Sequence, residues 1–155
     1  MKRQVTDAEY EALAEFRYRL RRFLHASEGI ARGAELEPQQ HQLLLAIKGL
    51  PAGRQATIGG LAERLQLRHH SAAELIDRAE ERGLVRRARS GVDRRQVFVR
   101  LTAEGTEKLR KLSVHHRDEL RSAGPALVRA LITLMHDAPA ADRTLGICES
   151  RAAGR

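Results

Sequence analysis

The stretch RHHSAAELIDRAEERGLVRRARSGVDRRQVFVRL, residues 68–101, decides the fold. Its first half repeats apolar residues at the i, i+3, i+4, i+7 spacing of one helix face, at Ala72, Leu75, Ile76 and Ala79. Gly83 follows, and glycine is the residue that most often ends a helix. Residues 84–89 and 96–101 are two short runs around a turn containing Ser90-Gly91, which predicts a β-hairpin. The stretch therefore predicts one helix followed by two strands.

Two shorter helices are predicted just before this stretch. Pro38 suits the first helical position of one, and Thr57 is a suitable N-cap for another that ends near Leu65. Residues 65–67 leave room for only a tight turn before the next helix. Two helices joined by a tight turn and followed by a hairpin match a winged helix-turn-helix, whose second helix fits the major groove of DNA. The hairpin, or wing, can enter the narrower minor groove.

Long helices are predicted on both sides of this region. Thr6 and Glu9 form a capping box at the start of a helix of about 25 residues, which Gly33 ends. Thr102 caps the last helical region, in which Gly124-Pro125 predicts a kink or a restart. Both helical regions carry apolar stripes, so we expect each of them to pack against a partner.

The positive charge is concentrated in the hairpin. The 155 residues carry a formal net charge of +8 and have a sequence pI of about 10.7, which favours a polyanionic partner such as nucleic acid. Residues 82–100 hold seven arginines and one acid, Asp93, so six of the eight net charges lie there. Aromatic residues make up only 3% of the chain, which argues against single-strand binding by base stacking. Double-stranded DNA is therefore the expected partner.

Composition and motifs exclude several other classes. Glycine and cysteine are too few for a collagen-like or disulfide-rich protein, and no apolar run approaches the roughly 18 residues of a membrane span. The first residues lack the apolar segment of a secretory signal, so we expect a cytoplasmic protein without a membrane partner. There is neither a phosphate-cradling glycine-rich loop nor a serine–histidine arrangement beside an oxyanion turn. We therefore expect no enzymatic activity and no cofactor.

Small and polar side chains are predicted on the outer face of the helix in residues 68–82. They would face base edges or phosphates, and they are His69, His70, Ser71, Ala73, Glu74 and Arg78. Imidazole and hydroxyl groups can donate or accept hydrogen bonds, Ala73 can contact a thymine methyl group, and Glu74 can accept from cytosine.

Two segments resemble the MarR-type (multiple-antibiotic-resistance regulator) winged-helix transcription factors. Residues 75–85, LIDRAEERGLV, are similar to the end of the family's recognition helix as it runs into the wing. Residues 93–105, DRRQVFVRLTAEG, are similar to its wing-to-helix signature. Leu36 to Leu44 and Ile58 to Leu67 also align, so the resemblance covers residues 36 to 112.

The resemblance implies a mainly α fold with a small β-hairpin wing: a winged helix-turn-helix with N- and C-terminal dimerisation helices. It divides the single compact subunit into an N-terminal dimerisation helix (1–35), a winged helix-turn-helix DNA-binding domain (36–104) and C-terminal dimerisation helices (105–155). It also implies a homodimer that binds a pseudo-palindromic operator. Such a dimer usually represses transcription until a small-molecule effector or an oxidant weakens the binding.

The resemblance also assigns roles in the wing. In the family, the wing aspartate pairs with an arginine two residues later and directs it into the minor groove. Asp93 and Arg95 match these two positions, and Arg94 lies beside them, where it would contact phosphate.

Several positions depart from the family pattern. Arg68 stands where Ser or Thr often caps the recognition helix, so that a backbone acceptor is missing there. His69 and His70 replace the more usual Arg, Ser or Gln, which leaves the base preference open. His41 stands where a core aromatic residue usually lies near the ligand crevice. The first helix lacks the reactive cysteine of the oxidant-sensing branch, so we do not expect peroxide sensing through the single cysteine, Cys148.

Two alternatives remain open. The side chains of His41, His115, His116 and Glu119 could converge into a metal or ligand site, but their spacing is not diagnostic and no metal is predicted. Alternatively, the chain could be a winged-helix interaction module that docks an acidic protein partner without binding DNA. Duplex affinity that falls steeply with salt while a sequence preference persists would favour DNA.

Overall fold

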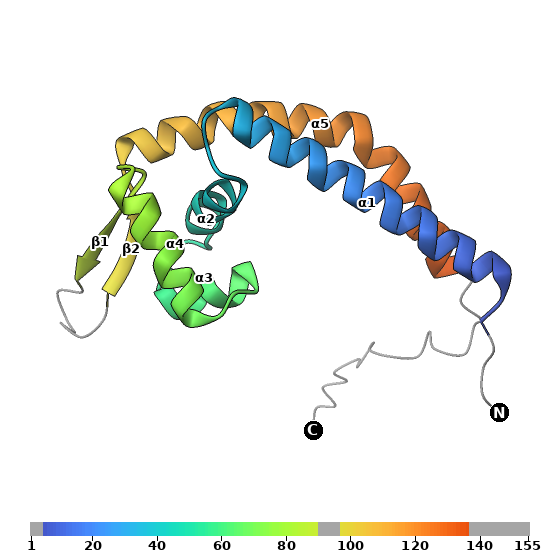
Figure 1. Ribbon diagram of the computed structural model, residues 1–155, viewed down its shortest axis with the longest axis horizontal. Coiled ribbons are helices and arrows are strands. Elements are labelled where there is room, and N and C mark those ends of the chain that lie inside the picture. Colours follow the sequence, from blue (N-terminus) through green and yellow to red (C-terminus); the bar gives the residue numbers. More distant parts are fainter. Residues whose placement is uncertain (1–4, 90–96, 137–155) are drawn as a thin grey trace, which may run out of the picture. The chain divides into compact units, whose positions relative to one another are not determined.

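The computed structural model describes residues 5–89 and 97–136. In chain order its elements are α1 (Asp7–Gly33), α2 (Pro38–Lys48), α3 (Ile58–Leu65), α4 (His69–Glu81), β1 (Val85–Arg89), β2 (Val97–Leu101) and α5 (Ala103–His136) (Figure 1). This mainly helical fold with one antiparallel hairpin confirms the predicted fold class.

The chain separates into two compact units. The larger unit spans residues 22–122 and contains α2, α3, α4, the hairpin and the adjoining parts of α1 and α5. The described part of the smaller unit combines residues 5–21 with residues 123–136. Each unit is described by itself below.

The core of the larger unit lies where α2, α3, α4 and the base of the hairpin meet. Burial of apolar side chains there is the main force that holds the unit together. The side chains that are at most 1% exposed in this cluster are Leu36, Leu43, Leu44, Leu61, Leu75, Ile76, Ala79, Leu84, Val85, Val99 and Leu112. The residues predicted to face inward from α4 are all among the buried residues of that helix.

The predicted helix starts are confirmed by their hydrogen bonds. The backbone N–H of Thr6 donates to Glu9 Oε2 at 2.7 Å, and the N–H of Glu9 donates to Thr6 Oγ1 at 3.3 Å, which makes the capping box. Thr57 Oγ1 accepts from the N–H of Gly60 at 3.1 Å. Thr102 Oγ1 accepts from the N–H of Gly105 at 2.9 Å.

The hairpin is fixed to the helices at its base. Val85 pairs with Leu101, and the register runs outward to Arg89 opposite Val97. Beside β2, the N–H of Val99 donates to the carbonyl of Ala56 at 2.8 Å, so the segment before α3 continues the ladder. The base of the wing is therefore held by hydrogen bonds to the core of the larger unit.

Of the kink or restart predicted at Gly124-Pro125, the restart does not occur, because α5 continues from Ala103 to His136 with Pro125 inside it. A proline removes one backbone donor from a helix, and its ring crowds the carbonyl four residues earlier, so its effect is confined to about one turn of this 34-residue helix. A helix of that length has enough other hydrogen bonds to continue past this turn.

The two helical segments of the smaller unit lie alongside each other (Figure 1). Large apolar side chains remain 43–68% exposed on them, namely Tyr10, Leu13, Tyr18, Val128, Leu131, Ile132 and Met135. Parts of both predicted apolar stripes are thus uncovered within a single chain. None of the described helices has a stretch long and apolar enough to cross a membrane.

Candidate nucleic-acid interface

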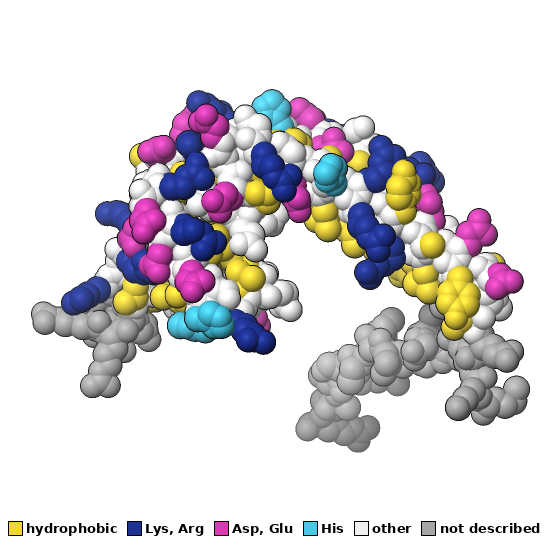
Figure 2. Space-filling view, viewed as in Figure 1, with side chains coloured by type: hydrophobic (Ala, Val, Ile, Leu, Met, Phe, Trp, Pro, Cys, Tyr) yellow, Lys and Arg dark blue, Asp and Glu magenta, His cyan; other side chains and the backbone are white. Residues whose placement is uncertain are grey.

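The outer face of α4 presents most of the side chains predicted to contact DNA. His69, His70, Glu74 and Arg78 are exposed, and Ser71 and Ala73 are partly exposed. The opposite face is anchored in the core, so the outer face is held by a rigid support. Figure 2 shows histidine side chains, in cyan, on the part of the larger unit formed by α3 and α4.

The start of α4 has no side-chain cap. Arg68 occupies the N-cap position with extended backbone angles and makes no capping hydrogen bond from its side chain, as its chemistry predicts. The first N–H group that is bonded within the helix is that of Ala72, which donates to the carbonyl of Arg68 at 3.0 Å. The N–H groups of residues 69–71 therefore point out of the first turn, where an anionic oxygen would be stabilised by them.

A left-handed residue makes the tight turn between α3 and α4. Gln66 has φ 54° and ψ 41°, and its N–H donates to the carbonyl of Glu63 at 3.1 Å. The N–H of Leu67 donates to the carbonyl of Ala62 at 2.9 Å, which completes the termination of α3. Leu67 then packs against the core and sets the direction in which α4 begins.

An arginine of the wing is held by α4. The Arg87 guanidinium contacts Asp77 Oδ1 at 2.6 Å and Glu80 Oε2 at 2.5 Å, while the backbone N–H of Arg87 donates to Glu80 Oε1 at 2.8 Å. The backbone N–H of Arg87, followed by its guanidinium, lowers the pKa of Glu80 below its ordinary value. We call these three residues the wing clamp. The clamp ties β1 to α4. It therefore engages, within the protein, one of the seven arginines that the sequence places in residues 82–100.

A second of these seven arginines, Arg82, also donates hydrogen bonds to other parts of the protein. Arg82 Nη1 donates to Gln40 Oε1 at 2.8 Å, and Arg82 Nη2 donates to the carbonyl of Glu35 at 2.5 Å. The sequence analysis missed both roles because these partners lie on other elements. For Arg87, the acids at positions 77 and 80 on one helix face were the signal that could have indicated a partner.

The remaining charge of the described hairpin lies on exposed arginines. Arg86 is directly opposite Arg100 in the antiparallel register, and both side chains are exposed, as is that of Arg89. Like charges directly opposite each other destabilise a hairpin by about 0.2–1 kcal/mol. A polyanion would neutralise this pair, so the arrangement favours an anionic partner on the wing.

Comparison with known proteins identifies the family. A model of the MarR family matches residues 34–96, which include α2, α3, α4 and β1. The winged-helix segment of this chain is therefore similar to the MarR family. No curated protein sequence gives a significant match to the chain.

Solved structures of MarR proteins are similar to the chain. AbsC, a MarR family transcriptional regulator from Streptomyces coelicolor, is 27% identical, with a TM-score of 0.69 over 79% of this chain and 82% of its own. Sco3205, a MarR family regulator from the same organism in complex with DNA, is 23% identical, with a TM-score of 0.70 over 88% of each chain. CouR from Rhodococcus jostii RHA1, bound to p-coumaroyl-CoA, is 21% identical, with a TM-score of 0.61 over 74% of this chain and 79% of its own.

These matches confirm the resemblance found in the sequence. Because the identities to Sco3205 and CouR are low, those two likenesses show a shared fold. MarR family members are transcription regulators and not enzymes, in agreement with the lack of a catalytic motif in the sequence.

The predicted wing contacts cannot be placed. Asp93, Arg94 and Arg95, which match the MarR wing positions, lie outside the described residues, as does Cys148. Their assigned roles in DNA binding stay predictions.

His41, which stands where MarR proteins usually have a core aromatic residue, stacks on another histidine. The rings of His41 on α2 and His116 on α5 lie 4.2 Å apart at an interplanar angle of 12°. His116 Nδ1 lies 2.9 Å from the carbonyl oxygen of Leu112, and its Nε2 lies 3.2 Å from that of Ser27. Burial, followed by the charge of His116, lowers the pKa of His41 to about 4. His41 is therefore neutral at physiological pH.

This pair does not extend into a metal site. In the part of the chain that is described, no group of three His, Cys, Asp or Glu side chains could hold a metal ion. His115 is exposed, and Glu119 is partly exposed. The sequence left open whether four side chains converge, namely His41, His115, His116 and Glu119. In the structure His41 and His116 stack on each other, and they form no metal site with His115 and Glu119.

Proposed function

We propose that the chain is a sequence-specific double-stranded DNA-binding transcriptional regulator that acts as a homodimer on a pseudo-palindromic operator. The observation that carries this proposal is the pairing of an exposed, uncapped recognition helix with a hairpin whose arginines face each other across the strands. The solved complexes of Sco3205 with DNA and of a MarR mutant from E. coli with operator DNA support it, because both share the fold.

Each outer residue of α4 has a proposed role. His69 and His70 head the helix and would read base edges, with Ser71, Ala73 and Glu74 beside them. Arg78, one turn further on, would contact phosphate. In the wing, Arg95 would enter the minor groove with its guanidinium directed by Asp93, and Arg94 would contact the phosphate backbone.

The dimer is proposed from the uncovered apolar side chains of the smaller unit. Tyr10 and Met135 are 60% and 68% exposed, and such side chains gain free energy when a second copy of the chain covers them. We assign the helices in residues 1–35 and 105–155 to this contact, which leaves residues 36–104 to bind DNA. Two copies would then bind half-sites about one helical turn apart.

We further propose that the protein is a repressor that responds to a small-molecule effector. The support comes from CouR, which shares the fold and was solved with p-coumaroyl-CoA bound. An effector that binds more tightly to a conformation with low DNA affinity would release the operator.

The test begins with selection of bound fragments from random duplex DNA, followed by titration of the recovered sequence and of a scrambled duplex. Affinity for both should fall steeply with salt, while the preference for the recovered sequence persists. The double variant His69→Ala/His70→Ala should lose that preference more than total affinity, and His115→Ala on α5 is the matched control. Equal losses on the two duplexes would contradict the proposed base reading.

The wing has its own test. Arg95→Ala should cost about 1–3 kcal/mol of DNA affinity, measured by gel-shift titration. Unchanged binding would remove Arg95 from the interface. Binding of an acidic protein, without any duplex binding, would instead favour the alternative winged-helix interaction module.

A further inference from the structure

Arg86 and Arg100 form a pair of facing cations near the base of the hairpin. They are directly opposite each other in the register, next to the pair of Val85 and Leu101. Side chains of directly opposite residues leave an antiparallel ladder on the same face, with their Cβ atoms about 4.5–5.5 Å apart. Both side chains are exposed, so the two guanidinium groups can approach one point above the strands. We call these two residues the arginine pair.

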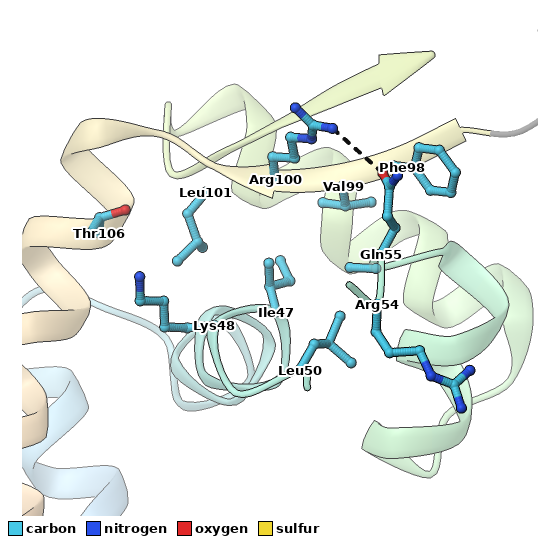
Figure 3. Close-up of a pocket in the computed structure, with 11 residues that line it drawn as sticks. Ile47, Lys48, Leu50, Arg54, Gln55, Phe98, Val99, Arg100, Leu101 and Thr106 are labelled. Atoms are coloured by element: carbon cyan, nitrogen blue, oxygen red, sulfur yellow. Dashed lines mark hydrogen bonds between the residues drawn. The ribbon is translucent and has the colours of Figure 1, made fainter. Parts of the chain in front are cut away.

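The arginine pair lies on the face of the hairpin that is turned away from α4. Successive side chains of a strand alternate between its two faces. Arg87, the neighbour of Arg86, reaches Asp77 on α4, so Arg86 lies on the other face. On β2, Figure 3 shows the Arg100 side chain on the opposite side of the strand from Leu101. The pair is therefore separate from the wing clamp and accessible to a molecule outside the protein.

The protein supplies no carboxylate to the arginine pair. The strands β1 and β2 contain no acidic residue, and within the described ranges neither arginine has an ion-pair partner. Arg100 Nη2 donates to Gln55 Oε1 at 3.5 Å, which is long for a hydrogen bond, so that this weak contact can give way to an anion (Figure 3). The two charges repel each other in the free protein, and an anion between them would remove that repulsion.

We propose that the arginine pair holds a single phosphate group of the operator backbone between its two guanidinium groups. Guanidinium groups match phosphate oxygens in geometry and bind them through charge-assisted hydrogen bonds. A hairpin in the minor groove has a sugar–phosphate backbone on each side, so the face turned away from α4 meets one of the two strands. The inference rests on the proposed DNA binding, and it gives the wing a phosphate contact in addition to those proposed for residues 93–95.

The salt dependence of duplex affinity shows whether the two arginines share one phosphate. Each phosphate that a protein neutralises contributes about 0.9 to the slope of log affinity against log salt concentration. If both guanidinium groups are needed to hold one phosphate, Arg86→Ala, Arg100→Ala and the double variant should each reduce that slope by about one. Two independent phosphate contacts would instead make the reduction in the double variant about two.

Arg89 provides the matched control. It is exposed on the same strand as Arg86, but it lies on the other face of the hairpin and is opposite Val97. The slope reductions of Arg89→Ala and Arg100→Ala should add in their double variant, because these two residues share no phosphate. Arg86→Glu would give Arg100 a carboxylate within the protein, so it should reduce the slope at least as much as the double alanine variant of the arginine pair. Urea unfolding should show that Arg86→Glu does not lower stability, which excludes misfolding as the cause.

Inorganic phosphate tests the same site without DNA. In amide NMR titrations at constant ionic strength, phosphate that replaces chloride should shift the signals of Arg86 and Arg100 saturably, and more than that of Arg89. Arg86→Ala should abolish the shift at Arg100. Equal shifts at all three residues, or no shifts, would overturn the proposal, as would additive slope reductions within the arginine pair. Phosphate binding without any duplex affinity would contradict the proposed function and exclude the operator as the source of the phosphate.

Discussion

The replacement Gly105→Ala should strongly destabilise the larger unit. A Cβ at Gly105 would lie 2.0 Å from the carbonyl oxygen of Leu84 and 2.9 Å from its carbonyl carbon, far inside the 3.4–4 Å of ordinary van der Waals contact. These atoms belong to the backbone, so no side-chain rotation can relieve the overlap. The same carbonyl accepts from the N–H of Thr102 at 3.1 Å, and this hydrogen bond links the start of α5 to the wing.

The expected loss follows from three contributions. Overpacking of a well-filled site costs about 1–3 kcal/mol, and here the upper end applies because backbone must move. Loss of the Thr102 hydrogen bond costs about 1 kcal/mol. Alanine regains about 1 kcal/mol of helix propensity over glycine. The free energy of unfolding should therefore fall by about 3 kcal/mol, a large part of the stability of a typical domain.

Urea unfolding followed by circular dichroism at one fixed protein concentration measures this change. Gly29→Ala is the matched control, because a Cβ at this exposed position of α1 meets nothing within 4 Å. It should raise stability by about 0.5–1 kcal/mol through helix propensity alone. If Gly105→Ala unfolds at the same urea concentration as the unmodified chain, the close approach of α5 to Leu84 does not constrain the fold and the reasoning is refuted.

Two further predictions concern the wing clamp and the stacked histidines. Arg87→Ala should lower the free energy of unfolding by about 1–2 kcal/mol, because it leaves Asp77 and Glu80 without their shared partner. Arg86→Ala should instead raise the free energy of unfolding by about 0.2–1 kcal/mol, because it removes the repulsion from Arg100. It should also reduce the salt slope of DNA binding by about one. A stability loss in Arg86→Ala as large as that in Arg87→Ala would contradict the clamp. His41 has its pKa lowered to about 4, so between that pH and 6.5 the unfolded chain holds a proton that the folded chain lacks. Stability should therefore fall by up to about 3 kcal/mol as the pH drops from 6.5 toward 4, and His41→Phe should abolish most of that fall in urea titrations at several pH values.

Local signals in the sequence predicted the elements well. Thr6, Thr57 and Thr102 each hold a cap whose hydrogen bonds involve residues three positions away, so that a short window contains the whole interaction. The change from helical to alternating periodicity likewise marked the end of α4 and the start of the hairpin. Such features depend on neighbours in the chain, and sequence shows these directly.

Features that depend on tertiary contacts were not predictable in the same way. The sequence shows how many arginines lie in residues 82–100, but it does not show which of them have partners elsewhere in the fold. Arg82 donates hydrogen bonds to Gln40 and Glu35, which lie more than 40 positions away. The stacking of His41 on His116 depends on how α2 packs against α5. At Pro125 the sequence left a kink and a restart open, and the continuous α5 excludes the restart.

The facing arginines of the hairpin have a consequence for how the free and the bound protein respond to electrolyte. Added ions screen the mutual repulsion of Arg86 and Arg100, so they should make the unliganded hairpin more stable. The same ions compete with the side chains for phosphate and should weaken attachment to a duplex. A single cross-strand pair would thus give the two states opposite ionic-strength dependences.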